Sequence, residues 1–275
     1  MSVHHQNFQH LLNKAQGYLT RVQALTVAAG SEMDHDDRYL APISRSFQET
    51  PLQLLGSAAD HLRLVGMSGA NQPELNPFAS ATLVRSAITS AATSLWVLHG
   101  ERKTRRIHML EVLADDSASY RTFITNTRAM HTTVGATAEV DRELGSMDRR
   151  DQWIITEYNA LAGPTVKKKA TIRQVSGAVS DTEMVCTAGD MLASALATRG
   201  LSSGQEVLAM WQRLSGYAHG RACAYLPNKT STGPADASGL ERVRIDGDPM
   251  FIISGAAAAM ELIEESFRLL DTLVA

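Results

Sequence analysis

Small and apolar side chains recur at alternating intervals of three and four residues along most of this chain, and this spacing restricts the fold more than any other feature. It places the apolar positions of each stretch on one face of an α-helix. The first such stretch ends before Gly30, and glycine often follows the last turn of a helix. Its apolar stripe consists of Phe8, Leu11, Ala15, Tyr18, Val22, Leu25 and Ala29. The sequence therefore predicts amphipathic helices that share a core.

Several later stretches repeat this pattern. The clearest start is at Asn76 and Pro77, because asparagine caps helices and proline is favoured at the first helical position. The stripe of that helix is made of Ala81, Val84, Ile88, Ala91, Leu95 and Leu98. The full set of further clear helices is Pro51–Met67, Pro77–His99, Ser180–Arg199, Gln205–Gly220 and Ala256–Ala275.

Two regions between these helices are less regular. The polar stretch Ser31–Thr50 carries Pro42 and is predicted as a loop, with the acidic run Asp34–Asp37 solvated rather than bound to a metal. The stretch Glu101–Met147 predicts two helices, with the break near 115–117 or near 132–135. The basic residues at its start are expected to lie on a solvated helix face.

Composition agrees with a helical fold. Hydrophobic residues make up 44% of the 275 positions, yet aromatic residues make up only 5%, which favours close helix packing on small side chains. We expect an all-α bundle of about seven or eight helices in a single domain, 1–275, with a weak boundary or a mobile segment at 148–179. A small late β-hairpin is predicted in Leu240–Ser254, where LERVRID and MFIIS flank Gly-Asp-Pro.

Charge and motifs narrow the functional classes. The net charge of −3 provides no overall basic field, so contact with a nucleic acid would need a local patch. The chain has no Walker loop, no GxGxxG after a strand, no HExxH, no CxxC pair and no GxSxG elbow. These patterns argue against an ATPase, a nicotinamide oxidoreductase, a zinc enzyme and an α/β hydrolase. We expect no cofactor and no metal.

The cellular setting is inferred from a few further features. Cys186 and Cys223 stand in apolar sequence without metal-ligand spacing, which favours reduced, packed thiols. The N-terminal residues lack the basic and apolar regions of a signal peptide, and no membrane span is expected. We therefore expect a cytoplasmic protein.

The densest group of polar side chains lies in the stretch Glu206–Leu226. A helix over Gln205–Gly220 places the core face at Val207, Trp211, Leu214 and Ala218. Gly216 lies within this helix and costs it about 1 kcal/mol relative to alanine, so close approach of a backbone, a ligand or a partner helix is expected there. The polar group itself consists of Arg213, Ser215, Tyr217, His219 and Arg221.

These side-chain types suit a phosphate group. Arginine offers a fork of charged donors, and histidine can donate or accept a proton near neutral pH. Arg213 and His219 are therefore the candidate catalytic pair, with Ser215, Tyr217 and Arg221 as binding residues. Two residues from other helices join the binding set: Arg85, a single charge in an apolar helix, and His61, on or beside a buried face.

The segment RLSGYAH, Arg213–His219, resembles the motif of the HEPN superfamily, in which an arginine precedes a histidine by a few residues. Three longer segments resemble an uncharacterised bacterial family of helical proteins with the same segment order: Ala58–Gly66, Pro77–Leu98 and Trp211–Gly220. The family resemblance implies a helical fold. The HEPN resemblance implies a small bundle that dimerises through the motif helix and, in many members, metal-independent ribonuclease activity at the arginine and histidine.

Two functions follow from the residues and the resemblance, and both stay open at this point. The first is a HEPN-like binding or dimerisation module around the Arg213–His219 helix that binds RNA or a partner protein. The second is a metal-independent ribonuclease of the toxin or phage-defence class, in which Arg213 and His219 act on phosphate. In both cases a homodimer is the expected assembly.

Overall fold

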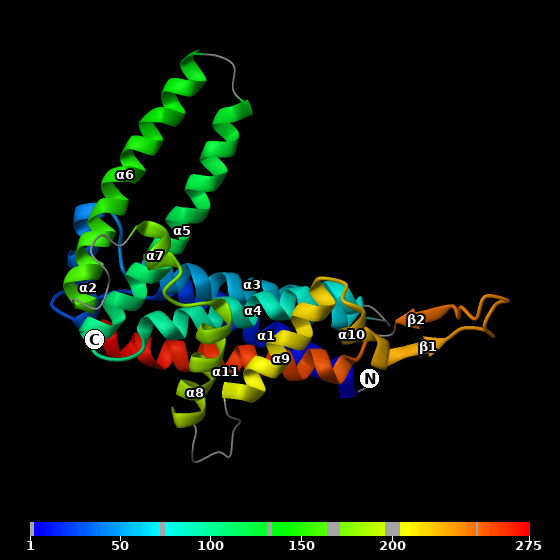
Figure 1. The fold of residues 1–275 in the computed structure, drawn as a ribbon. Helices are drawn as coiled ribbons and strands as arrows, with labels where there is room; N and C mark the ends of the chain where they lie inside the picture. Colours follow the sequence, from blue (N-terminus) through cyan, green and yellow to red (C-terminus); the bar gives the residue numbers. More distant parts are fainter. Residues whose placement is uncertain (1–2, 72–74, 131–133, 164–170, 196–203, 246) are drawn as a thin grey trace. The chain divides into compact units, whose positions relative to one another are not determined.

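The computed structural model describes residues 3–71, 75–130, 134–163, 171–195, 204–245 and 247–275 (Figure 1). These residues contain eleven α-helices and one two-stranded hairpin, which confirms the all-helical prediction and the late hairpin. The number of helices exceeds the expected seven or eight. The extra helices are mostly short ones, too short to leave an apolar stripe in the sequence.

The chain divides into two compact units. The first comprises 1–27, 49–96 and 181–275, and the second comprises 28–48 and 97–180. The single domain expected over 1–275 stays a prediction, because two compact units can act as one domain.

In the first unit, α1 (Val3–Ala24) packs along α3 (Glu49–Asn71). The predicted stripe is buried at Phe8, Leu11, Ala15 and Tyr18, but the helix ends at Ala24 rather than Ala29. Gly66 brings the two helices together, since a Cβ atom there would lie 2.8 Å from the backbone nitrogen of Leu12. The close approach of α1 and α3 therefore depends on the missing side chain.

The helix α4 (Pro77–Leu98) is rich in apolar residues. All six predicted stripe residues, from Ala81 to Leu98, are buried. Among the described residues, α4 alone is long and apolar enough to cross a membrane by length and composition, and most of that stretch is buried. Core helices of water-soluble proteins have the same character.

The helices α8 (Asp181–Ala195) and α9 (Gly204–Ala218) pack against each other through two glycines. A Cβ atom at Gly189 would lie 2.7 Å from the Cα atom of Gly204. The backbone N–H of Gly204 donates to the carboxylate of Asp190 at 2.8 Å, which holds the start of α9 against α8. The predicted residues 196–199 of the first helix lie outside the described residues.

After α9 the chain forms short elements and then the last long helix. They are α10 (Ala222–Tyr225), the 3-10 turn η3 (Leu226–Asn228), the strands β1 (Lys229–Ser231) and β2 (Val243–Ile245), and α11 (Pro249–Val274). The strands are antiparallel, with Thr230 opposite Arg244. The second strand thus lies in the predicted segment LERVRID, whereas the first strand lies before it, at Lys229–Ser231.

The expected second strand, MFIIS, is helical, so the position of the hairpin was predicted wrongly. The Asp248 carboxylate caps α11 by accepting from the backbone N–H groups of Met250 and Phe251, and Pro249 occupies the first helical position. Phe251, Ile252 and Ala256 are buried on one face of this helix. A short apolar run does not show whether its side chains repeat with the period of a helix or of a strand, so its sequence fits both.

In the second unit, the predicted loop Ser31–Thr50 contains α2 (Glu32–Leu40), the 3-10 turn η1 (Ala41–Ile43) and the first residues of α3. The Ser31 hydroxyl caps α2 by accepting from the backbone N–H of Asp34. The expectation of a solvated acidic loop is therefore wrong. The serine cap favours a helix here, and arginines elsewhere in the chain pair with the acidic residues.

Those cations come from the start of α5 (Arg102–Met130). Arg105 and Arg106 hold the two oxygens of the buried Asp36 carboxylate, each at 2.8 Å. Hydrogen bonds from Arg102 and Arg105 lower the pKa of Glu32 to about 2. The basic start of α5, expected on a solvated face, is instead an ion-pair network in which Arg105 is buried.

The remaining helices of this unit are α6 (Val134–Ala162) and α7 (Ile172–Ser176). Of the two predicted breaks in Glu101–Met147, the one near 115–117 is wrong, because α5 passes through it without interruption. The one near 132–135 falls partly outside the described residues, between the end of α5 at Met130 and the start of α6 at Val134. The segment expected as a boundary, 148–179, contains the end of α6, residues 164–170 outside the described part, and α7. The first fifteen residues of this segment belong to the long helix α6, and α7 is a short helix near its end.

Candidate functional site

The helix α9 carries the predicted catalytic pair. Val207, Trp211 and Leu214 are buried, which confirms the predicted core face, although Ala218 is only partly buried. Both members of the pair, Arg213 and His219, are exposed. Of the other predicted residues on this stretch, Arg221 is exposed, Ser215 is partly buried and Tyr217 is buried.

No contact between Arg213 and His219 is found among the described residues. The guanidinium carbon of Arg213 lies 4.2 Å from the ring centroid of Phe251 on α11, which is the geometry of a cation–π contact. His219 directly follows α9, and its backbone N–H donates to the carbonyl of Ser215 at 3.0 Å. The structure thus places both side chains at the surface near the end of one helix.

The end of α9 explains Gly216. Gly220 has a φ of +63°, and the backbone N–H of Arg221 donates back to the carbonyl of Gly216 at 2.8 Å. This is the left-handed glycine ending that turns a chain back over its own helix. It brings α10 onto α9, where a Cβ atom at Gly216 would lie 2.5 Å from the Cβ atom of Ala224. The close approach expected at Gly216 therefore comes from the chain itself.

Four aromatic rings gather where α4, α9, α10 and α11 meet. Phe78 lies 5.5 Å from Tyr225 and 6.1 Å from Tyr217, measured between ring centroids, and Tyr217 lies 5.9 Å from Phe251. Tyr217 and Phe251 are buried, but Phe78 keeps 38% of its surface exposed and Tyr225 is partly exposed. The cluster therefore has a buried base and an accessible outer edge. Tyr217, predicted as a binding residue, belongs to the buried base of the cluster.

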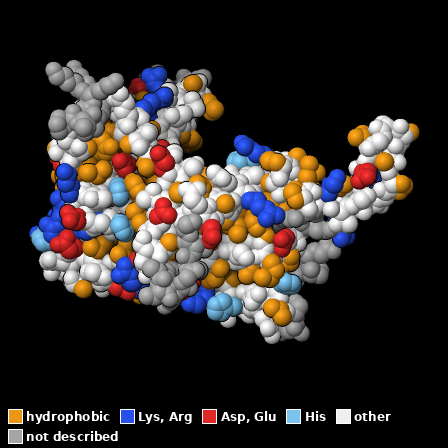
Figure 2. Space-filling model, turned by 60° about the horizontal axis from the view of Figure 1, so that its bottom comes forward, with side chains coloured by type: hydrophobic (Ala, Val, Ile, Leu, Met, Phe, Trp, Pro, Cys, Tyr) orange, Lys and Arg blue, Asp and Glu red, His pale blue; other side chains and the backbone are white. Residues whose placement is uncertain are grey.

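The surface next to this cluster is basic. The segment from Arg213 to Arg244 contains five Lys and Arg residues and two acidic residues, against a net charge of −3 for the whole chain. The basic residues are all exposed: Arg213, Arg221, Lys229, Arg242 and Arg244. Figure 2 shows the hairpin projecting from the molecule, with basic side chains near its base and apolar side chains along it.

A hydrogen-bonded turn closes the hairpin. One carboxylate oxygen of Asp236 accepts from the backbone N–H groups of Ser238 and Leu240 and from the Ser238 hydroxyl. These bonds lower the pKa of Asp236, with the Ser238 hydroxyl as the largest cause. The Asp236 carboxylate therefore holds the turn at the tip of the hairpin. Both strands are largely exposed, and among the described residues neither has a second strand beside its outer edge.

Arg85 and His61 have different surroundings. Arg85 on α4 lies with its guanidinium carbon 4.9 Å from the Trp211 ring on α9, and the Trp211 indole N–H donates to the Thr89 hydroxyl at 2.8 Å. Arg85 therefore supports the core side of α9. His61 Nδ1 lies 2.8 Å from the carbonyl oxygen of Ser57, one turn earlier on α3. No described contact joins His61 to α9.

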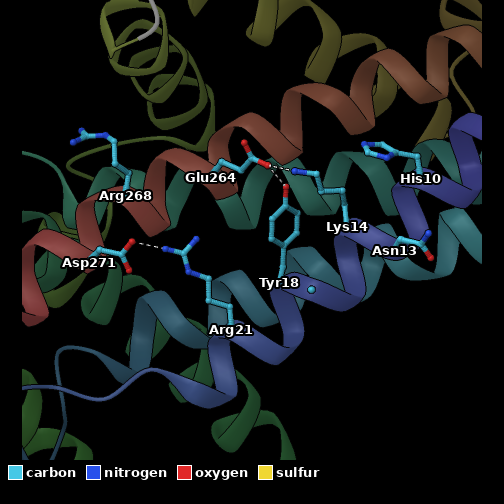
Figure 3. Close-up of a pocket in the computed structure, with 9 residues that line it drawn as sticks. His10, Asn13, Lys14, Tyr18, Arg21, Glu264, Arg268 and Asp271 are labelled. Carbon is cyan, nitrogen blue, oxygen red and sulfur yellow. Dashed lines mark hydrogen bonds and ion pairs between the residues drawn. The ribbon is translucent and has the colours of Figure 1, made fainter.

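A groove that the sequence did not predict lies along α1 and α11 (Figure 3). Its volume is about 690 Å³. Lys14 pairs with Glu264 at 2.8 Å and Arg21 pairs with Asp271 at 2.5 Å, so the two ion pairs stand seven residues apart on both helices. Opposite charges at the same heptad spacing on the two helices were the signal that could have revealed this seam.

Tyr18 forms part of the floor of this groove and donates to the carboxylate of Glu264 at 2.8 Å. Burial is the main cause that raises the pKa of Tyr18, and the bond to Glu264 raises it further. The third cation, Arg268, pairs with Glu265 at 2.6 Å. The lysine and both arginines are thus engaged by carboxylates of the protein. We interpret the groove as a polar seam that fixes the register of α11 on α1.

Metal chemistry and known families give no further assignment. The described residues contain no group of three or more His, Cys, Asp or Glu side chains placed to hold a metal ion. Cys186 is partly buried and Cys223 is exposed, so the expectation that both thiols are packed holds only for Cys186. Comparison of the chain with protein-family models, curated proteins and solved structures finds no match. The HEPN resemblance therefore stays a prediction.

Proposed function

We propose that this chain is a helical RNA-binding module. Its contact surface, which we call the aromatic–basic surface, consists of the outer edge of the aromatic cluster and the exposed cations beside it: Phe78, Arg213, His219, Arg221, Tyr225, Lys229, Arg242 and Arg244. The observation that carries the proposal is the meeting of accessible rings with a local excess of positive charge in an otherwise acidic chain.

Each part of the surface has a role that suits single-stranded RNA. Exposed rings such as Phe78 can stack on unpaired bases, which contributes about 1–3 kcal/mol per base. Exposed arginines and lysines bind the phosphate backbone and make affinity depend on salt. The hairpin carries three of the cations, so it extends the surface along a strand of RNA. Duplex RNA offers no unstacked bases and would use only the cations.

Binding is favoured over catalysis by the geometry of the predicted pair. Arg213 rests on the ring of Phe251, and His219 lies beyond the end of α9. A reacting phosphate needs an acid–base group and a charged donor that converge on it. Ribonuclease activity of Arg213 and His219 stays the alternative prediction, and a homodimer stays the expected assembly.

The test measures the affinity of the full chain for a fluorescent single-stranded RNA by polarisation. Phe78→Ala should weaken binding roughly 5-fold to 150-fold, as expected for the loss of one stacked base. Arg221→Glu together with Lys229→Glu should weaken binding at least about 10-fold. Replacing both cations should also reduce the slope of log affinity against log salt by roughly 1.4, because each phosphate contact contributes about 0.7 for a single strand.

Two control variants make the same types of substitution at exposed positions outside the aromatic–basic surface. Phe123 is 61% exposed on α5 and Arg149 is exposed on α6, so Phe123→Ala and Arg149→Glu should leave the affinity unchanged. Equal loss in test and control variants would contradict the assignment of the surface. The same RNA, incubated with the native chain and with His219→Ala and run on a denaturing gel, tests the alternative. RNA cut by the native chain but not by His219→Ala would establish the ribonuclease.

A further inference from the structure

The second unit contains a small pocket between α5 and α7. The aromatic–basic surface belongs to the first unit and shares no residue with this pocket. The volume of the pocket is about 220 Å³, below the roughly 300–1,000 Å³ of sites for drug-sized ligands. A group of a few heavy atoms is therefore the size of ligand to consider.

Every polar side chain that lines this pocket can donate a hydrogen bond. Its polar side chains are Arg121, Thr122, Thr125, Asn126 and Arg173, and no carboxylate lines it. Hydroxyl and amide groups can donate as well as accept, whereas the two guanidinium groups only donate. Such a set fits a ligand that accepts hydrogen bonds and carries negative charge.

The lining residues of α5 lie on one polar face of this helix. The lining residues of α5 fall at Ala118, then at positions three, four, seven and eight further on, which is the spacing of a face that packs on another element. Earlier on α5, the residues Leu110, Leu113 and Ala114 are buried. At the pocket, the equivalent positions carry Arg121, Thr125 and Asn126 instead, and Thr125 and Asn126 are exposed although α7 packs against α5. These polar side chains are therefore accessible to a small ligand from solvent.

Arg121 is held in place from behind. Its Nη2 atom lies 2.7 Å from the carboxylate of Asp151 and 2.8 Å from that of Asp148, both on α6. The Asp151 carboxylate also accepts from the Ser117 hydroxyl. These two acids orient the guanidinium and offset its charge. Arg173 on α7 has no such carboxylate in the ion pairs of the described residues, so it supplies the positive charge that a ligand would meet.

We propose that this pocket binds a compact phosphate-type anion, either free phosphate or the phosphate of a small monoester. Arg173 neutralises the charge, and the side chains of Thr125 and Asn126 donate hydrogen bonds to the oxygens. Arg121 forms the oriented wall. The proposal is independent of RNA binding, since it uses none of the residues of the aromatic–basic surface.

The test titrates the full chain with inorganic phosphate at constant ionic strength and follows the arginine Nε–H signals by NMR. Phosphate should shift the Arg173 signal along a saturable curve, and chloride should not. Arg173→Gln should weaken phosphate binding at least about 10-fold when the shifts of backbone signals in α5 are followed instead. Asn126→Ala should weaken it by a smaller factor, whereas Arg149→Gln, an exposed residue on α6, should not change it.

A parallel titration with glycerol phosphate identifies the source of the phosphate group. Tighter binding than that of inorganic phosphate indicates a monoester ligand, and equal or weaker binding indicates free phosphate. Shifts that grow linearly without saturation, or an unchanged affinity in Arg173→Gln, would overturn the proposal, because they would show only general attraction of anions to the surface.

Discussion

Replacing Asp36 with alanine should lower the free energy of unfolding by about 3–5 kcal/mol, measured by urea denaturation at neutral pH. The Asp36 side chain is 1% exposed and the Arg105 side chain is 5% exposed, and their ion pair at 2.8 Å is therefore shielded from water. Arg105 would keep its contact with Glu32, whose side chain is 45% exposed, but would lose the buried carboxylate. The loss of the only buried carboxylate that pairs with the buried Arg105 in the described residues accounts for the large effect.

A matched exposed pair provides the control for this prediction. Asp60 pairs with Arg63 within α3, and the Asp60 side chain is 63% exposed. Asp60→Ala should change the free energy of unfolding by less than about 1 kcal/mol, as is typical of surface ion pairs. Hydrogen exchange should locate the loss in Asp36→Ala to the amides of α2 and the start of α5. A loss as small as that of Asp60→Ala would refute the structural role given to the network.

Replacing Gly216 with alanine should destabilise the protein by about 1–3 kcal/mol, although alanine favours helices more than glycine does. The new methyl group would lie 2.5 Å from the Cβ atom of Ala224, closer than packed carbon atoms allow, so α10 must move off α9. Because Tyr225 on α10 belongs to the aromatic cluster, the same variant should also weaken RNA binding. Thermal or urea denaturation measures the first effect.

Two further variants separate packing from helix propensity at Gly216. Gly17 lies in the middle of α1, in the same unit, and a Cβ atom there would meet nothing within 4 Å. Gly17→Ala should therefore stabilise the protein by up to about 1 kcal/mol. Ala224→Gly should restore most of the stability lost in Gly216→Ala. If it restores none, the tight contact between α9 and α10 is not the reason for the glycine.

The long helices could be predicted from the sequence because their information is local. The stripe from Ala81 to Leu98 repeats over several turns and is buried as predicted. The Asp36 environment could not be predicted in this way, since its partners Arg105 and Arg106 lie about seventy residues further on. The segment Asp34–Asp37 by itself shows only four adjacent polar residues. It carries no information about the distant arginines that pair with the buried Asp36.

The candidate site was predictable only in part for the same reason. The residues of α9 could be assigned to a core face and a polar face from their spacing. The aromatic cluster could not, because Phe78, Tyr225 and Phe251 come from three separate helices that tertiary packing brings together. MFIIS was misread as a strand because its five residues are too short to show a helical period. The Asp248 cap and Pro249 were the local signals that favoured a helix.

The central claim is that RNA meets this chain at the aromatic–basic surface. The most direct test is ultraviolet crosslinking of a bound single-stranded RNA to the full chain, followed by mass spectrometry of the attached peptides. We predict crosslinks at Phe78 and Tyr225 and within the segment from Arg213 to Arg244, which high salt abolishes. Crosslinks confined to α5, α6 or the groove between α1 and α11, or no crosslink at any salt concentration, would contradict the claim.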